Sequence, residues 1–256
     1  MIDIHSHILP GIDDGAQSMQ DSIEMAKAAV EEGIHTIIAT PHHKNGKFEN
    51  QKSDILPLVS KLNDRFEAES IHLTVLPGQE CRIYGEILED YEKGHILTLN
   101  QSSQYLFIEF PSSNVPRYAE KLLYDIQVEG LTPVIVHPER NAELIERPDK
   151  LYKLVTNGAV TQLTASSLVG YFGKNIQKFS QQMIEANLTH FIASDAHNIH
   201  NRTFKMEESM DYIEKKYGID TVYYFTENAE MLIENKTIYK EIPEQIKKKK
   251  KFLGIF

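Results

Sequence analysis

The opening stretch 1-MIDIHSHILPGIDDG-15 decides how the rest of the chain is interpreted. Its first five residues are mostly apolar and predict a short strand. His5 stands at the end of this strand, and His7 follows two positions later. Side chains at positions i and i+2 of a strand point to the same face. His5 and His7 can therefore reach one point in space, with Ser6 turned away, and this is how a strand presents two imidazoles to a metal ion.

Apolar segments rich in Ile, Val and Thr recur along the chain and predict buried parallel strands. After 1–5 they lie at 35–40, 71–78, 105–110, 132–137, 159–164 and 189–195, which makes seven. Helical periodicity appears between them at 18–32, with Ser18 as N-cap and Gly33 as stop, and at 116–129, 175–187 and 204–217. Because Pro57 interrupts 50–70, we expect the helix there to begin near Pro57. Repeated strand–helix units predict an α/β fold with a parallel sheet, closed or doubly wound.

Composition narrows the class of protein. The chain has 256 residues, 41% of them hydrophobic, which suits one large globular domain. A formal net charge of -10 argues against a nucleic-acid partner, because binding to phosphate backbones requires a basic surface. Cys81 is the sole cysteine and cannot form an internal disulfide. Since neither a signal peptide nor a membrane-spanning apolar run is present, we expect a cytoplasmic protein.

The candidate ligands stand at the carboxyl ends of predicted strands or just after them, and Asp14 comes from the loop after the first strand. In barrels of parallel strands, active-site residues gather at that end. Burying such groups without partners would cost several kcal/mol each, and binding to a cluster of metal ions removes that cost. His43 and His200 are interpreted as ordinary histidines. The sequence therefore predicts a metal centre with these ligands: His5, His7, Asp14, His42, Glu80, Glu109, His137, Asp195 and His197.

Four separated motifs make a family resemblance specific. "DIHSH", His42 after the second strand, "VIVHPER" and "SDAH" resemble the motifs of the PHP family, named for polymerase and histidinol phosphatase domains. Within it, "GIDDG", "IEFP", "TPVIVHPER" and "FIASDAHN" resemble the manganese-dependent protein-tyrosine phosphatases of Gram-positive capsule and exopolysaccharide loci. The resemblance runs from Met1 to about Asn235. It implies a single-domain distorted (β/α)7 barrel, which agrees with the count of seven strands; we place the domain at 1–240 and a Lys-rich tail at 241–256.

The resemblance also implies three divalent metal ions. Carried over residue by residue, the ligands are His5, His7, Glu80 and Asp195 for the first, Glu80, Glu109 and His137 for the second, and Asp14, His42 and His197 for the third. Glu80 would bridge the first two ions. Imidazole and carboxylate ligands without thiolate suit Mn, Fe or Zn, and the resemblance favours Mn²⁺.

The implied reaction is phosphate monoester hydrolysis without a covalent phosphoenzyme. A hydroxide held between two ions would attack phosphorus in line. The planar guanidinium of Arg140, in "HPER", would hold two phosphoryl oxygens. We therefore expect Arg140, Glu80 and Asp195 to carry catalysis.

Cys81 offers a different mechanism that its surroundings do not support. Cysteine-dependent tyrosine phosphatases place an arginine six positions after the nucleophile. Here Arg82 follows Cys81 directly, and Ile87 stands at the sixth position. We interpret Cys81 as a small residue beside a metal ligand.

Three functions follow from these patterns. The first is a tyrosine phosphatase that acts on a bacterial tyrosine kinase and its substrates, and so regulates capsule or exopolysaccharide synthesis. The second keeps the chemistry but acts on histidinol phosphate, another small phosphomonoester or a nucleic-acid phosphodiester, of which the net charge disfavours the last. The third is a non-catalytic, metal-stabilised module that docks on a kinase. The ending "IKKKKKFLGIF" is expected to be a solvated tail, with weak contact to an anionic membrane surface as the alternative.

Overall fold

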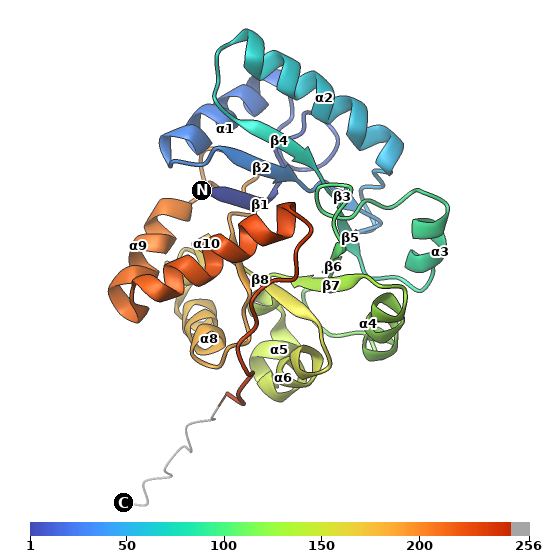
Figure 1. Ribbon diagram of the computed structural model, residues 1–256, viewed down its shortest axis with the longest axis vertical. Helices are drawn as coiled ribbons and strands as arrows, with labels where there is room; N and C mark the ends of the chain where they lie inside the picture. Colours follow the sequence, from blue (N-terminus) through green and yellow to red (C-terminus); the bar gives the residue numbers. More distant parts are fainter. Residues whose placement is uncertain (247–256) are drawn as a thin grey trace, which may run out of the picture.

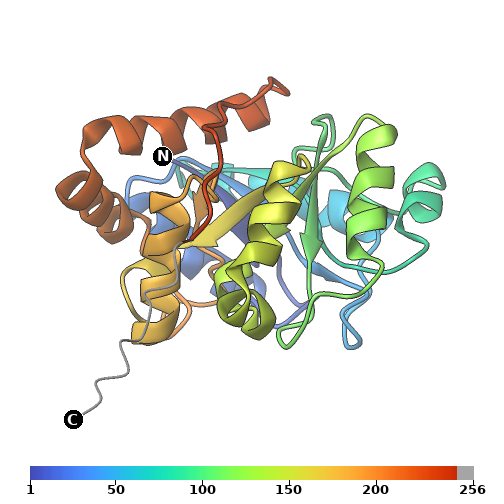
Figure 2. The same cartoon turned by 90° about the horizontal axis from the view of Figure 1, so that it is seen from below.

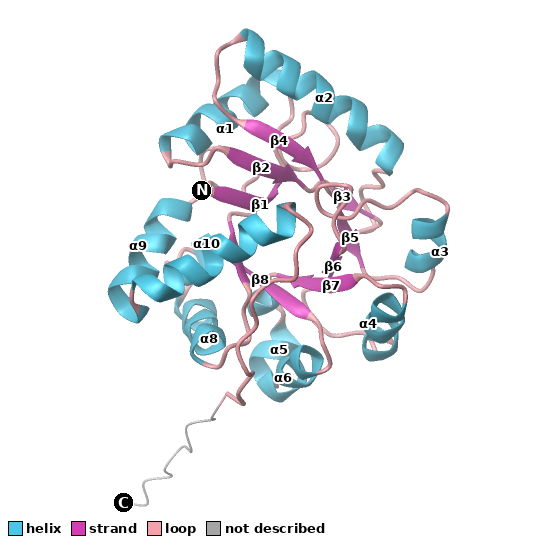
Figure 3. Ribbon diagram, in the orientation of Figure 1, coloured by secondary structure: helices cyan, strands magenta, loops and turns pink. Residues whose placement is uncertain are grey.

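Nine strands form the centre of the part described, residues 1–246, in this computed structural model (Figure 3). All named strands pair in parallel. One sheet has the order β1 (Ile2–Ser6), β2 (Thr36–Ala39) and β4 (Thr74–Pro77). The second has the order β3 (His42–His43), β5 (Glu80–Arg82), β6 (Tyr105–Glu109), β7 (Thr132–Val136), β8 (Val160–Thr164) and β9 (Phe191–Ala193).

The two sheets belong to one barrel, because two strands are each broken in the middle. β2 leads into β3 past Pro41, and β4 leads into β5 past Gly78. Gly78 is required by close approach, since a Cβ there would lie 2.6 Å from Ile38 Cγ2. At the other edge, Ser6 of β1 forms a parallel bridge with Ala196, which follows β9. With each broken strand counted once, residues 1–246 contain the predicted seven-stranded barrel.

Helices surround the strands on the outside (Figure 1). The side chain of Ser18 accepts a hydrogen bond from Asp21 N and caps α1 (Met19–Glu31), as predicted. The four predicted helices are α1 (Met19–Glu31), α4 (Ala119–Val128), α8 (Lys174–Glu185) and α9 (Met206–Tyr217). The described chain also contains α3 (Ile87–Glu92), α5 (Ala142–Glu146), α6 (Pro148–Thr156), α7 (Ala165–Leu168) and α10 (Ile219–Ile233).

The prediction that a helix begins near Pro57 is wrong. The helix α2 runs from Lys52 to Ala68 with Pro57 inside it. It starts earlier because Gln51 N donates a hydrogen bond to Asp54 Oδ2 at 2.9 Å, which satisfies the first turn. Pro57 then removes one hydrogen bond near the start of a long helix. The buried stripe of Ile55, Val59, Leu62 and Phe66 offsets that loss.

Two apolar clusters hold the barrel together. The larger one lies between the strands and the surrounding helices and includes Ile37, Leu106 and Ile135. The smaller one combines strand residues such as Phe107 with Leu232 of α10. Figure 2 shows α10 lying across one end of the barrel. That is the end where the strands begin, so the opposite end is left open for a site.

The first strand, β1, departs from regular pairing with β2 where it approaches that open end. Its register with β2 shifts between Asp3 and Ser6, which marks a β-bulge at the start of the histidine pair. Such bulges re-aim side chains beside active sites. The buried Asp3 carboxylate accepts hydrogen bonds from Ser194 N at 2.9 Å and Ser194 Oγ at 2.5 Å, and so joins β1 to the end of β9. This contact fixes the edge at which the barrel closes.

Within residues 1–246, no helix is both long and apolar enough to cross a bilayer. The chain after α10 packs on the barrel at Ile238, and Glu244 N donates a hydrogen bond to Ala186 O at 2.8 Å. The domain boundary at residue 240 stays a prediction. The lysine run and its proposed membrane contact lie outside the described residues.

Candidate metal centre

The nine predicted ligands meet at the open end of the barrel. His5 belongs to β1 and His7 follows it; His42, Glu80 and Glu109 belong to β3, β5 and β6; His137 follows β7; Asp195 and His197 follow β9; and Asp14 lies in the loop before α1. Three sets of their ligand atoms lie within 4.8 Å of one another. The sets are His7, Asp14, His42 and His197; His5, His7 and Glu80; and His42, Glu80 and Glu109. The division of ligands among individual ions remains a prediction.

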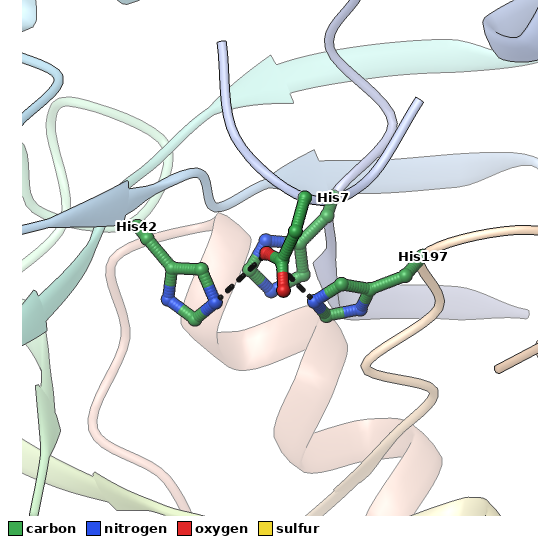
Figure 4. Close-up of side chains that lie close together, drawn as sticks. His7, His42 and His197 are labelled. Carbon is green, nitrogen blue, oxygen red and sulfur yellow. Dashed lines mark ion pairs between the residues drawn. The ribbon is translucent and has the colours of Figure 1, made fainter. Parts of the chain in front are cut away.

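Asp14 joins the imidazoles at the outer side of the centre. Its Oδ1 lies 3.3 Å from His42 Nε2 and 3.5 Å from His197 Nε2. Figure 4 shows these two ion pairs as dashed lines, with His7 beside them. The Asp14 side chain is 42% exposed, whereas those of His7 and His197 are buried. Asp14 therefore lies where the centre meets solvent.

Neighbouring side chains orient the first two histidines. Nδ1 of His5 donates to the Gln162 amide oxygen at 3.0 Å, and Nδ1 of His7 donates to Asp13 Oδ2 at 2.7 Å. Both rings therefore turn Nε2 towards the centre, where the two Nε2 atoms lie 3.3 Å apart. Partners of this kind fix the tautomer of a ligating histidine and raise its basicity.

Glu80 occupies the middle of the site. Its Oε1 lies 2.8 Å from His137 Nε2, and its Oε2 lies 2.8 Å from His42 Nδ1. The same Oε2 lies 3.5 Å from His5 Nε2 and 3.4 Å from His7 Nε2. A carboxylate with imidazoles on both oxygens is placed as a bridging ligand would be.

Two arginines converge on a single carboxylate. Arg140 Nη2 lies 2.6 Å and Arg202 Nη2 3.0 Å from the same oxygen of Asp195, Oδ2. The other oxygen, Oδ1, lies 3.4 Å from His5 Nε2 and 3.3 Å from His7 Nε2. Asp195 therefore connects the histidines to the guanidinium groups.

The donor set fits divalent metal ions. Among the described residues, Glu80 Oε2, Glu109 Oε2, His42 Nδ1 and His197 Nε2 are buried and lie near groups of opposite charge, but none of these contacts has the geometry of a hydrogen bond. Buried polar atoms without a well-aligned partner are costly, and four of them in one cluster indicate a site for a cation. All belong to imidazoles or carboxylates, so the set suits Mn, Fe or Zn.

The electrostatics of the cluster also call for positive charge. Burial would raise the pKa of Glu80, but His42 and His5 hold it well below its usual range. Burial would lower the pKa of His42, yet the Glu80 carboxylate raises it to about 9. Burial and the charge of Glu80 raise the pKa of Glu109 to about 7. The carboxylates thus draw protons onto their neighbours, in the positions where bound cations would supply the charge.

A pocket of about 230 Å³ opens beside the centre. Its lining combines charged groups with apolar ones: Arg140, Arg202, Glu109 and Asp195 with Phe110 and Pro138. Such a lining can contact both an anionic group and an apolar one.

Three residues that we interpreted as ordinary lie apart from this chemistry. The Cys81 thiol is buried and donates to Gln79 Oε1 at 3.3 Å, and burial raises its pKa. A thiol in this state is a poor nucleophile. His43 is buried beside Tyr84, and His200 is exposed.

Four side chains of the site were not predicted from the sequence. They are Asp13 and Gln162, which orient His7 and His5; Arg82, whose Nε lies 3.2 Å from Glu109 Oε2; and Arg202, which faces Asp195. Asp13 had a signal in "GIDDG", because a second carboxylate next to a ligand is a natural partner for it. The other three carry no local pattern, since each acts across a long separation in sequence or from an irregular loop.

The geometry agrees with what comparisons with known proteins found. The family described as "Capsular polysaccharide synthesis, CpsB/CapC" matches residues 1–234. Tyrosine-protein phosphatase YwqE of Bacillus subtilis is 52% identical over 256 residues, with 100% of both chains covered. The putative tyrosine-protein phosphatase CapC of Staphylococcus aureus is 40% identical, also with 100% of both chains covered. This chain belongs to the CpsB/CapC family.

Solved structures support the same fold. A structure from work on YwqE and on CpsB of Streptococcus pneumoniae, described as unique metal-dependent tyrosine phosphatases, has a TM-score of 0.94 at 52% identity and covers 97% of this chain and 100% of that chain. An organophosphorus hydrolase from Deinococcus radiodurans has a TM-score of 0.53 at 13% identity, with 91% of each chain covered, and supports the fold alone.

Proposed function

We propose that this protein is a metal-dependent tyrosine-protein phosphatase of capsular polysaccharide synthesis. The proposal rests on one observation: the predicted metal ligands and two arginines lie together at one end of the barrel. The imidazole and carboxylate side chains of the nine predicted ligands gather there, and Arg140 and Arg202 both contact one of them, Asp195. The membership of the CpsB/CapC family supports the same activity.

The residues that would hold the metal ions are the nine predicted ligands, with Glu80 as the bridging carboxylate. We propose three ions and favour manganese, with iron and zinc as the other metals that the ligands suit. When bound, the ions supply positive charge at the phosphoryl group and a water that ionises near neutral pH. Glu80 and Asp195 would contribute by fixing the ligand geometry from buried positions.

The chain's own cations would bind the substrate's phosphate. Arg140 and Arg202 both reach Asp195 Oδ2, so their guanidinium groups already point to one place. Burial would raise the pKa of Asp195, but these two arginines hold it well below its usual range, so it stays ionised. A phosphoryl group entering the pocket would share the donors that now face Asp195.

The apolar wall of the pocket favours an aromatic substrate. Phe110 and Pro138 line the same pocket as Arg140 and Arg202 and could contact the phenyl ring of a phosphotyrosine whose phosphate the arginines bind. The relatives named tyrosine-protein phosphatases favour a protein substrate, in particular a bacterial tyrosine kinase and its substrates, over a small phosphomonoester such as histidinol phosphate. A non-catalytic kinase-docking module has no use for an open, phosphate-binding metal centre.

One side-by-side assay tests this function. The protein, loaded with manganese, is given a phosphotyrosyl peptide, a phosphoseryl peptide of the same sequence and histidinol phosphate. We expect the highest kcat/KM for the phosphotyrosyl peptide. A preference for histidinol phosphate would favour the second function, and no turnover of any substrate by metal-loaded protein would favour the docking module.

A further inference from the structure

A buried carboxylate stands next to Arg140 and has no part in the reaction described so far. Glu139 lies in the 3-10 turn Pro138–Arg140, which follows β7, and it is 0% exposed. It does not belong to any of the three ligand sets. A fully buried carboxylate is costly unless polar groups surround it, so its position calls for an explanation.

The hydrogen bonds of Glu139 tie this turn to the neighbouring strand. Its Oε1 accepts from Thr164 N at 3.1 Å and from Ser167 Oγ at 2.7 Å. Thr164 ends β8, and Ser167 lies in α7, which follows directly. Glu139 therefore clamps the turn after β7 to the junction of β8 and α7.

The clamped turn has a strained start. His137 has φ 35° and ψ 50°, in the left-handed region that residues other than glycine rarely adopt. Such a conformation persists only where the surroundings enforce it. His137 is a predicted ligand and Arg140 a predicted phosphate-binding residue, and both side chains are carried by this one turn.

The guanidinium of Arg140 is only partly held by its own neighbours. Its Nη2 contacts Asp195, while its Nε is buried without a hydrogen-bond partner among the described residues. Within those residues the Glu139 carboxylate forms no ion pair with Arg140, so it acts on the guanidinium through the turn that carries both side chains.

We propose that Glu139 is a positioning residue for the phosphatase reaction. It holds the turn from His137 to Arg140 against the β8–α7 junction and aims the Arg140 guanidinium at the phosphoryl group. This inference rests on the proposed function, because it requires that Arg140 bind the substrate's phosphate.

The test uses Glu139→Gln in the full-length, manganese-loaded protein. The amide oxygen can still accept from Thr164 N and Ser167 Oγ, but less strongly than a carboxylate, so the clamp on the turn is weakened. We expect kcat/KM for a phosphotyrosyl peptide to fall about tenfold, with the inhibition constant of inorganic phosphate raised by a similar factor and the metal content unchanged. The matched control is Glu143→Gln, because Glu143 pairs with Lys150 on the next helix. It should leave both constants near the wild-type values.

A double-mutant cycle separates positioning from simple stability. In an Arg140→Ala background, Glu139→Gln should cause less than about a twofold further loss, because its effect is transmitted through Arg140. Equal losses with and without Arg140, or a wild-type phosphate inhibition constant in the single variant, would overturn the inference.

Ser167→Ala keeps the test decisive if Glu139→Gln does not fold. It removes one of the two donors to Glu139 and leaves the carboxylate and its bond from Thr164 N, so we expect a smaller rise of the phosphate inhibition constant that also vanishes without Arg140. An unchanged constant would overturn the clamp. A wild-type protein that does not hydrolyse the peptide would overturn the proposed function and this inference with it, whereas an active wild type with an unaffected Glu139→Gln variant overturns the inference alone.

Discussion

Replacing Asp13 by asparagine should weaken metal binding without touching a predicted ligand. Asp13 Oδ2 accepts from His7 Nδ1 at 2.7 Å and from His42 N at 3.2 Å, while its Oδ1 accepts from Gly15 N at 2.9 Å. Both carboxylate oxygens are therefore acceptors, and an asparagine supplies only one. Either its amide N–H faces Gly15 N, or it faces His7 Nδ1 and drives the proton to Nε2, the atom that points to the centre.

The size of the effect follows from this geometry. Loss of a buried carboxylate that orients a ligating histidine typically weakens metal binding ten- to a hundredfold, which is about 1.4 to 2.7 kcal/mol. We expect manganese titration of the stripped Asp13→Asn variant, followed by phosphatase activity, to need that much more metal for half-maximal activity, with kcat largely restored at saturation. The control is Asp21→Asn, whose carboxylate caps α1 and faces no ligand. An unchanged manganese midpoint in Asp13→Asn would refute the orienting role.

Three further outcomes can be checked. Arg140→Ala should lower kcat/KM for a phosphotyrosyl peptide roughly a hundredfold, about 3 kcal/mol, because a preorganised donor is lost, and the metal content should stay at the wild-type level. Near-wild-type kinetics would show that Arg140 serves the structure of the loop. Cys81→Ser should keep kcat within about a few-fold, because the thiol contacts only Gln79 among the polar groups described, and a loss of about a thousandfold at intact metal content would restore a cysteine nucleophile. Burial, followed by the charge of Lys240, lowers the pKa of His190 to about 3 in the folded protein. Below the usual histidine pKa of 6.5 the unfolded chain therefore binds a proton at His190 that the folded protein does not bind. The free energy of unfolding consequently falls as the pH drops from 6.5 towards 3. His190→Asn should reduce that fall by about 2 kcal/mol between pH 7.5 and 5, measured by urea unfolding, and parallel falls in both proteins would contradict it.

The barrel was predictable because each of its strands has a recognisable pattern in the local sequence. Each predicted strand is a short apolar run, and each meets its neighbour in parallel. The separation of β3 and β5 from β2 and β4 was not predictable, since Pro41 and Gly78 break those strands only as the barrel closes around them. Pro57 misled the prediction for α2, because tertiary packing outweighed a local helix breaker.

The candidate site also has one part that could be predicted from the sequence and one part that could not. The gathering of the predicted ligands could be foreseen because residues such as His42 and Glu109 stand where predicted strands end, and parallel strands end at one rim. The supporting residues are not. Gln162 lies within β8 and meets His5 across 157 positions of sequence. Arg202 reaches Asp195 from an irregular loop, so only the folded chain reveals its partner.

We expect the cluster around Glu80 to hydrolyse phosphotyrosine only when it holds metal ions. The most direct measurement is a titration of thoroughly stripped protein with manganese, in which bound metal and the hydrolysis of a phosphotyrosyl peptide are followed on the same sample. We predict no turnover in the stripped protein and activity that rises with the metal bound. Full activity in protein shown to be free of metal would contradict the claim.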